Sequence, residues 1–349
     1  MGSPKIDINF KSKAQTLMKK SERGVVALVL KDTIGVLSNP ITIDSIEKIP
    51  KTLTEDNKEQ IKLALKGSYK ATKEVLVFVV EENVEDSFPL LLNSDWNYIA
   101  IPEVQKVDDV ATWVKGLREN KHRKVQAILP NCKANNKGII NFTSDELKTK
   151  DKTFSTAQYC SRIAGILASI PLNISATYFV LDELISVKPV DDPDKAIDNG
   201  ELIIINDGKK CKIGRAVNSL TTVIEGQSEE WKKIKIVSAM DMIYTDIREE
   251  FEDSYIGKYT NNYDDKCLFI VKINSYFKEL ELENILNKGD NYVNLNIEKQ
   301  KLYIEKQGIK TDRFTDIEIK EFNTGSKLFL GGNVSILDAM EDLELDLEV

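Results

Sequence analysis

Residues 24–30 read Gly-Val-Val-Ala-Leu-Val-Leu, and residues 74–80 read Glu-Val-Leu-Val-Phe-Val-Val. Short runs that are apolar almost throughout are typical of strands buried on both faces of a sheet. Between them, residues 54–69 carry apolar side chains at helical spacing, and Thr54 is a typical N-cap residue. A strand, a helix and a second buried strand in this order predict that the N-terminal part of the chain folds as an α/β layer.

The same layer is predicted to extend to about residue 150. Residues 107–119 have the pattern of a helix, and short apolar runs predict strands at 98–101, 125–129 and 139–142. Beyond this layer, residues 155–170 form a predicted helix rich in Ala and Gly. Because small residues permit close packing, we expect this helix in the core.

The second half of the chain changes its periodicity twice. Residues 201–206 and 211–216 flank Asn206-Asp207-Gly208, a strong hairpin signal. Amphipathic helices are predicted at 232–254 and 266–286. A period of two then predicts strands at 292–297, 301–305, 316–319 and 327–330. The predicted fold class is therefore α+β / α/β, with an α/β N-terminal region and a C-terminal helix-plus-sheet domain.

Both ends of the chain alternate strictly between apolar and polar residues, which predicts extended β-strand arms. The apolar positions are Ile6, Ile8 and Phe10 at one end and Leu343, Leu345, Leu347 and Val349 at the other. An isolated strand is marginal in water, and unpaired strands recruit partners by adding to a sheet edge. The basic N-terminal arm and the acidic C-terminal arm suit adjacent pairing. From these residues alone, an internal edge strand and exchange between subunits are equally open.

Composition excludes several classes of partner. The 349 residues carry a net charge of −8, whereas nucleic-acid binding needs a surplus of Lys and Arg, so no nucleic acid is expected. The apolar runs are too short and too interrupted for a membrane span, and we expect no cleaved leader. Cys132, Cys160, Cys211 and Cys267 lack metal-ligand spacing. They predict reduced, mostly buried thiols, no metal site and synthesis in the cytoplasm.

No catalytic constellation is expected. His122 is the only histidine and lies between Lys121 and Arg123, so a Ser-His-Asp or Cys-His arrangement has no other base to use. Phosphate-binding and dinucleotide motifs are absent from the sequence. The polar run 215–222 fits an internal turn better than an anion-binding loop. We therefore expect no enzymatic activity and no cofactor, with an α/β enzyme built on residues 24–150 as a rival hypothesis.

Several segments, taken in order, resemble the tail sheath proteins of contractile phage tails and R-type bacteriocins, especially those of Gram-positive, clostridial-type particles. These segments are Pro4–Phe10, Arg23–Ala27, Arg162–Ala168, Pro171–Thr177, Gly200–Leu202, Arg215–Thr222, Lys235–Val237, Asp246–Arg248, Tyr255–Asn261 and Asp338–Asp342. The resemblance covers nearly the whole chain and is strongest from 155 to 349. It implies a structural subunit that stacks with copies of itself as hexameric rings around an inner tube and contracts to drive that tube through a target cell envelope.

The resemblance also implies partners and a location. The further partners are the baseplate and tail-terminator proteins, without membrane insertion. The subunit is expected to be made in the bacterial cytoplasm and to function in a phage tail or a released bacteriocin particle. A secretion-system sheath is the alternative machine. Contraction is expected to draw on energy stored in the extended assembly and to need neither nucleotide nor metal.

Four regions follow from the resemblance: an N-terminal arm over 1–23, an outer α/β domain over 24–150, a sheath core domain over 151–340 and a C-terminal arm over 341–349. In the family, the arms of neighbouring subunits add strands to a sheet in another subunit's C-terminal domain. The resemblance thus favours exchange between subunits over an internal edge strand. The candidate acceptor positions on the predicted strands are Val293, Leu295, Ile297, Leu302, Ile304, Leu328 and Leu330.

Overall fold

The computed structural model describes residues 18, 20–21, 23–33 and 38–348. The chain divides into two compact units, which are described separately below. The sheet unit comprises Ser21–Thr245 together with Ile336–Val349, and the helical unit is built on Asp246–Ser335. This division at 245/246 lies far from the sequence-based boundary at 150/151, because the sheet takes its last strand from residues beyond 200. The four assembly regions expected from the sequence remain a prediction.

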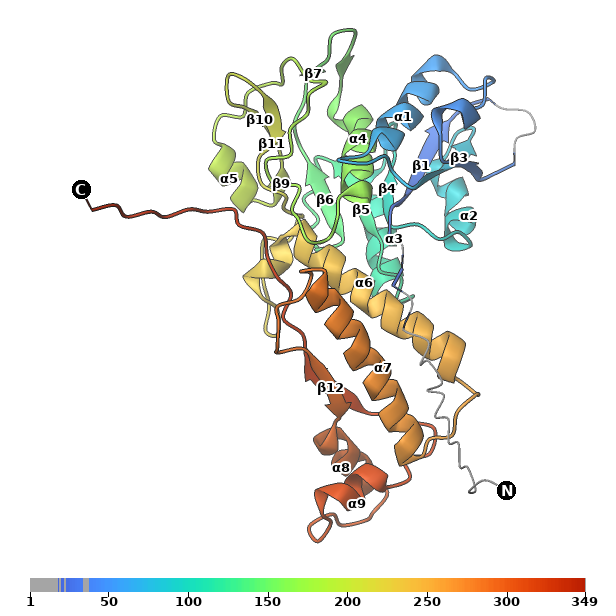
Figure 1. Ribbon diagram of the computed structural model, residues 1–349. Coiled ribbons are helices and arrows are strands. Elements are labelled where there is room, and N and C mark those ends of the chain that lie inside the picture. Colours follow the sequence, from blue (N-terminus) through green and yellow to red (C-terminus); the bar gives the residue numbers. More distant parts are fainter. Residues whose placement is uncertain (1–17, 19, 22, 34–37, 349) are drawn as a thin grey trace, which may run out of the picture. The chain divides into compact units, whose positions relative to one another are not determined.

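The sheet unit is organised around one large sheet (Figure 1). Among the described residues it has seven strands in the order β2-β3-β1-β4-β5-β6-β9. All neighbours run parallel except the β2–β3 pair, which is antiparallel. The strands are β1 (Val25–Lys31), β2 (Ile41–Ile43), β3 (Glu74–Val80), β4 (Tyr98–Ala100), β5 (Gln126–Pro130), β6 (Ile139–Phe142) and β9 (Glu201–Leu202). The predicted α/β layer is confirmed.

Helices cover both faces of this sheet, which explains why its central strands are apolar throughout. On β1, Val26 and Leu28 belong to one core cluster, which also contains side chains of α1 (Glu55–Lys66) and α4 (Thr156–Ser169). Ala27 and Val29 point the other way, into a cluster with α2 (Phe88–Leu92) and α3 (Val107–Glu119). A strand between two helical layers needs apolar residues at every position.

The helix α4 packs closely on α1, as its small residues predicted. Ser155 caps α4 through a capping box with Gln158, and Thr54 caps α1. A Cβ atom added to Gly165 would lie only 2.2 Å from the carbonyl oxygen of Ala64. The two helices therefore approach each other at a point where only glycine fits.

A buried ion pair ties α4 to the following loop. Arg162 Nε lies 2.5 Å from Glu183 Oε1, and Lys66 Nζ lies 3.0 Å from Glu183 Oε2. Burial opposes ionisation of Glu183, but the charge of Arg162 and the hydrogen bonds from Arg162 and Lys66 outweigh it and lower the pKa of Glu183 to about 2. The pair therefore stabilises the fold only while this carboxyl is ionised.

The remaining elements of the sheet unit are short. The predicted hairpin is confirmed: β10 (Ile204–Asn206) pairs antiparallel with β11 (Cys211–Ile213), and Asn206 Oδ1 accepts a hydrogen bond from Gly208 N at 2.9 Å. The others are η1 (Ile46–Lys48), η2 (Val84–Ser87), β7 (Leu147–Lys148), β8 (Thr153–Phe154), α5 (Pro193–Asp198) and η3 (Glu229–Lys232). The first part of α6 (Ile234–Glu250) also belongs to this unit.

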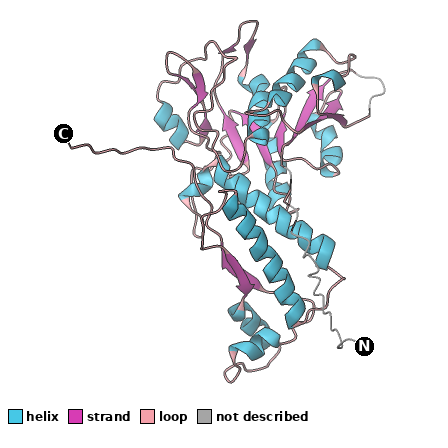
Figure 2. Cartoon of the chain, in the orientation of Figure 1, coloured by secondary structure: helices cyan, strands magenta, loops and turns pink. Residues whose placement is uncertain are grey.

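The helical unit begins with the last turn of α6 and the π-helical turn η4 (Phe251–Tyr255). It continues with α7 (Tyr263–Leu282), β12 (Tyr292–Leu295), α8 (Ile297–Glu305), α9 (Asp316–Glu321) and β13 (Leu330–Asn333) (Figure 2). The strands β12 and β13 form a two-stranded antiparallel ribbon. Tyr276 Oη on α7 donates a hydrogen bond to Asp246 Oδ2 at 2.5 Å, which links α7 to the end of α6.

Two strands predicted in this unit are helices. Residues 301–305 lie in α8, and residues 316–319 lie in α9. The cause is local capping: Asn296 accepts a hydrogen bond from Lys299 N, and Thr315 forms a capping box with Glu318. The strand assignment is therefore wrong for Leu302 and Ile304. Ile297 begins α8, and Leu328 precedes β13.

Candidate assembly surfaces

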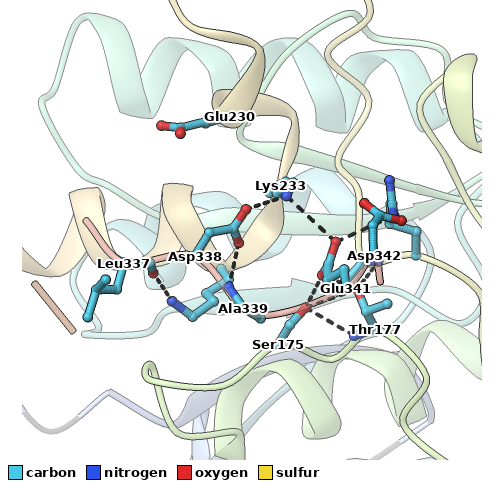
Figure 3. Close-up of polar contacts among 12 residues, drawn as sticks. Ser175, Thr177, Glu230, Lys233, Leu337, Asp338, Ala339, Glu341 and Asp342 are labelled. Atoms are coloured by element: carbon cyan, nitrogen blue, oxygen red, sulfur yellow. Dashed lines mark hydrogen bonds and ion pairs between the residues drawn. The ribbon is translucent and has the colours of Figure 1, made fainter. Parts of the chain in front are cut away.

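The first candidate surface is the root of the C-terminal arm. Residues 337–342 lie in an extended segment against the sheet unit (Figure 3). The side chain of Lys235 donates to the carbonyl oxygen of Leu337, and the ammonium of Lys233 pairs with Asp338. These two contacts fix the direction in which the segment approaches Glu341.

Glu341 occupies the centre of this surface. Its side chain is 5% exposed, and its Oε1 accepts hydrogen bonds from Thr177 Oγ1 at 2.6 Å and Ser175 Oγ at 3.0 Å. Its Oε2 lies 3.4 Å from Arg215 Nε and 3.7 Å from Lys233 Nζ. A buried carboxylate is stable only with such paired charges and donors. We call this cluster the C-terminal anchor; its members are Ser175, Thr177, Arg215, Lys233, Lys235, Asp338 and Glu341.

The positive charges of the anchor stabilise the carboxylates of the C-terminal segment in their ionised form. Burial opposes the charge of Lys233, but its hydrogen bond to Asp338 and the nearby Glu341 carboxylate raise the pKa of Lys233 overall. Lys235 is dominated by burial instead, which lowers its pKa although Asp338 and Glu341 act in the opposite direction. Arg215 Nη2 also pairs with Asp342 Oδ1 at 2.5 Å.

The polar run 215–222 supplies part of the anchor. The predicted internal turn is confirmed for Asn218, which is buried, donates to Trp231 O at 2.8 Å and accepts from Leu220 N at 3.0 Å. Ser219 Oγ similarly donates to Asn136 O at 2.9 Å. Sequence reasoning missed the role of Arg215 at the start of this run. The acidic residues of the C-terminal segment are a signal that such a cation has a carboxylate partner.

Beyond the anchor, the side chains of the C-terminal arm are exposed to solvent. The side chains of Leu343, Leu345 and Leu347 are 87%, 65% and 77% exposed, and their residues belong to no strand. Val349 lies outside the described residues, as do Ile6, Ile8 and Phe10. The described part of the arm therefore presents its apolar face to solvent.

The second candidate surface is the ribbon formed by β12 and β13. Asn296 N donates to Phe329 O at 2.9 Å, which sets the alternation of hydrogen-bonded pairs along the ribbon. In this alternation the backbone groups of Val293 and Leu295 point away from β13, and those of Leu330 and Gly332 point away from β12.

The two outer edges of the ribbon differ. The side chain of Asn274 on α7 donates to Val293 O at 3.1 Å and accepts from Val293 N at 2.7 Å, so it occupies the β12 edge at this point. Among the described residues, the outward backbone groups of Leu330 and Gly332 have no such partner. The β13 edge is thus the accessible one for strand addition.

The remaining candidate groups are metal-binding side chains and the four cysteine thiols. Within the described ranges, no group of three or more His, Cys, Asp or Glu side chains is arranged to hold a metal ion. Cys132, Cys160 and Cys211 are buried and Cys267 is half-buried, and none forms a disulfide. Burial raises the pKa of Cys132 to about 11 and also raises that of Cys160. The thiols of Cys132 and Cys160 are therefore protonated at neutral pH and are poor nucleophiles.

The other residues that the sequence analysis considered as sites are Asp192, His122 and Trp96. Asp192 caps α5 by accepting a hydrogen bond from Lys195 N at 3.1 Å, and His122 is exposed with a positive φ of 55°. Trp96 is buried and donates to Leu91 O at 2.9 Å. No helix in the described part of the chain has the length and apolar character needed to cross a membrane.

Two family models match this chain. The phage tail sheath protein central domain matches residues 82–219, and the phage tail sheath C-terminal domain matches residues 226–349. The tail sheath protein of Clostridium phage phiCD119 is 35% identical, with 100% of this chain and 99% of that protein covered.

Solved structures share the fold. A sheath tail protein from Desulfitobacterium hafniense superposes with a TM-score of 0.70 at 18% identity, covering 83% of this chain and 93% of that one. The helical sheath of the anti-feeding prophage in its contracted state gives a TM-score of 0.69 at 12% identity, covering 100% and 99%. At these identities, the likeness concerns the fold.

Proposed function

Because this chain belongs to the phage tail sheath family, we propose that it is a structural subunit that polymerises around an inner tube and contracts to drive the tube through a cell envelope. Its partners are copies of itself in stacked hexameric rings, the tube protein, and the baseplate and tail-terminator proteins. It works in a phage tail or a released bacteriocin particle after synthesis in the cytoplasm, and it has no enzymatic role. The observation that carries the proposal is an anchored arm with exposed, alternating leucines.

The arm is built as a strand donor. Its root is held by the C-terminal anchor through Glu341, so the arm leaves the sheet unit from a defined point. Its leucines are exposed at every second position, and a strand with one apolar face gains free energy when that face is buried. Strand addition to a sheet edge of another subunit would supply both the apolar surface and the backbone hydrogen bonds.

The β13 edge is the acceptor that we favour in the helical unit. Its outward backbone groups at Leu330 and Gly332 are open among the described residues, whereas Asn274 already occupies Val293 on β12. Of the acceptor positions expected from the sequence, Val293, Leu295 and Leu330 lie on the ribbon. The N-terminal arm, with Ile6, Ile8 and Phe10, is proposed as the second donor, and residues 24–150 as the outward-facing domain.

Negative-stain electron microscopy of the purified chain tests the proposal. We expect tubes or helical polymers with hollow centres. A chain that stays monomeric across the concentration range, also in the presence of its tube protein, would contradict a sheath role.

A second experiment tests the source of the energy for contraction. Extended particles are triggered after treatment with a chelator and in the absence of nucleotide, and we expect them to contract normally. Contraction that stops on chelation, or that requires ATP, would contradict stored elastic energy.

A further inference from the structure

Both arms of the chain are tied to the first half of α6, residues 234–241, which belongs to the sheet unit. On the N-terminal side, Arg23 is the last residue of the predicted arm, and its Nη1 donates a hydrogen bond to Ser238 O at 2.7 Å. On the C-terminal side, the ammonium of Lys235 donates to the carbonyl oxygen of Leu337. Ser238 follows Lys235 by one helical turn, so only about 4.5 Å along the helix axis separates the two attachment points.

Further contacts hold the chain beside both attachment points. Directly after Arg23, the backbone N–H groups of Gly24 and Val25 donate to Asn97 Oδ1 at 2.8 and 3.0 Å. On the other side, the C-terminal anchor holds Glu341, whose side chain is 5% exposed. Both arms are therefore fastened to the sheet unit at the place where they leave it.

A buried polar network fixes this half of α6 on the sheet. Arg118 of α3 donates two hydrogen bonds of 2.8 Å to the carboxylate of Asp241. Ser238 Oγ lies 2.8 Å from Tyr98 Oη on β4 and accepts a hydrogen bond from Gln126 Nε2 on β5 at 3.1 Å. All of these residues are at most 4% exposed. Because directional bonds fix the register of a helix more closely than apolar contacts do, α6 is held against sliding along the sheet.

We propose that residues 234–241 are a tension node, through which tension passes from one arm to the other when neighbouring subunits move. The inference rests on the proposed sheath function, because that function places the arms under tension. The tension runs from Arg23 across one turn of α6 to Leu337. This path bypasses Asp246–Ser335 of the helical unit, so the proposed acceptor stays folded while the subunit's own arms are pulled.

Without the tension node, the same pull would act on the ribbon. The strand β13 ends at Asn333, four residues before Leu337, so a chain freed from α6 and the anchor pulls on the end of this strand. A two-stranded ribbon is marginal in water, and pulling one strand from its end breaks the pairs one after another. Tension that enters at residue 343 reaches Glu341 first, and the order of contacts along the chain therefore protects the ribbon.

Single-molecule pulling of the full-length chain tests the tension node. The handles are placed at both termini or, as a reference geometry, at the exposed residues 150 and 209 of the sheet unit. We expect Lys235→Met to speed the first release between the termini about 10-fold or more at constant force, because it leaves Leu337 O without its buried donor. Release in the reference geometry should be unchanged. The matched control Lys70→Met, at an exposed lysine of the same unit, should change neither rate.

A destabilising substitution outside the node should give the opposite pattern. Gly165 lies between residues 150 and 209 in the chain and packs against Ala64, so Gly165→Val should speed release in the reference geometry and leave the first release between the termini unchanged. For the N-terminal attachment, the handles are moved to the N-terminus and residue 150. In that geometry Arg23→Met should speed the first release, and Lys235→Met should not.

Three results would overturn the inference. The first is an equal rate of first release for wild type and Lys235→Met between the termini. The second is an equal acceleration of Lys235→Met in both geometries, which a general loss of stability would give. The third is an Arg23→Met chain that releases its N-terminal side as slowly as wild type. Because pulling uses single subunits and tube formation is scored separately by negative-stain microscopy, the tension node and the sheath role fail separately.

Discussion

Deleting residues 343–349 isolates the contribution of the C-terminal arm. The deletion leaves the C-terminal anchor intact, since Asp338 and Glu341 remain. In the subunit the three leucines are 65% to 87% exposed, so their loss removes little buried area, and we expect the free energy of unfolding to change by less than about 0.5 kcal/mol. The truncated chain should therefore fold normally.

The effect on assembly should be much larger. Full burial of one leucine contributes about 1.5–3 kcal/mol, and these side chains have roughly three quarters of their surface still to bury. Together they contribute about 3–7 kcal/mol to each contact between subunits. The deletion should then lower the association constant about 100-fold to 100,000-fold. The entropic cost of association is about 4–15 kcal/mol, so such a loss is enough to abolish polymerisation.

Circular dichroism and thermal unfolding report the fold, and sedimentation with negative-stain microscopy reports assembly. A matched control reorders residues 343–348 to Leu-Leu-Leu-Glu-Asp-Glu, which keeps the composition but destroys the alternation. We expect this variant to fail in assembly as the deletion does. Normal tubes from the truncated chain would refute strand donation by this arm, and normal tubes from the reordered chain would refute its strand geometry.

Three further outcomes concern the subunit itself. Gly165→Val should lower the free energy of unfolding by about 1–3 kcal/mol or more, because a Cβ would lie 2.2 Å from the Ala64 carbonyl oxygen; urea unfolding measures this, and an unchanged midpoint would contradict the close packing. The depressed pKa of Glu183 means that its pair with Arg162 stabilises the fold above about pH 4.5. Up to about 3 kcal/mol should be lost as the pH falls toward 2, and an Arg162→Met variant should not show this loss. Glu341→Gln should cost about 1–3 kcal/mol, since two cations lose their buried partner, and proteolysis of the arm should accelerate; unchanged proteolysis would argue against the anchor.

The sheet could be predicted from sequence because its signals are local and redundant. Continuous apolar runs at 24–30 and 74–80 admit only a strand covered on both faces, and the observed strands are Val25–Lys31 and Glu74–Val80. The helix at 107–119 agrees with its predicted bounds, since its apolar stripe covers these residues; its N-cap is Lys106, not Asp108 or Asp109 as the sequence suggested. Each of these elements is specified by its own residues.

The ribbon region could not be predicted in the same way. In residues 301–305 the apolar positions Leu302 and Ile304 fit an alternation as well as a turn of helix, and the helix that begins after the Asn296 cap includes them. Leu302 stays exposed while Ile304 is buried, which an alternating strand with both on one face would not give. Short segments with mixed periodicity need their capping residues read together with their apolar ones.

The C-terminal anchor lay beyond sequence reasoning for another reason. Arg215 and Glu341 are far apart in the chain, and only the fold brings them to 3.4 Å. A charge becomes informative when its environment is known, because burial sets the cost of leaving it unpaired.

These features constrain the symmetry of the proposed polymer. The donor is the acidic arm after Asp342, and the acceptor is the β13 edge, so the two halves of the contact are different surfaces of one chain. A contact between unlike surfaces is heterologous, and when it is not exchanged reciprocally between two copies, its repetition closes into a ring or continues as a helix. One arm and one acceptor per chain therefore suffice for unlimited growth. A chain truncated after Asp342 should cap a growing polymer, because it retains the acceptor but lacks the C-terminal arm that would enter the next subunit. Mixing truncated and full-length chains at increasing ratios should shorten the tubes progressively, and tubes of unchanged length at an equal ratio would contradict a head-to-tail contact.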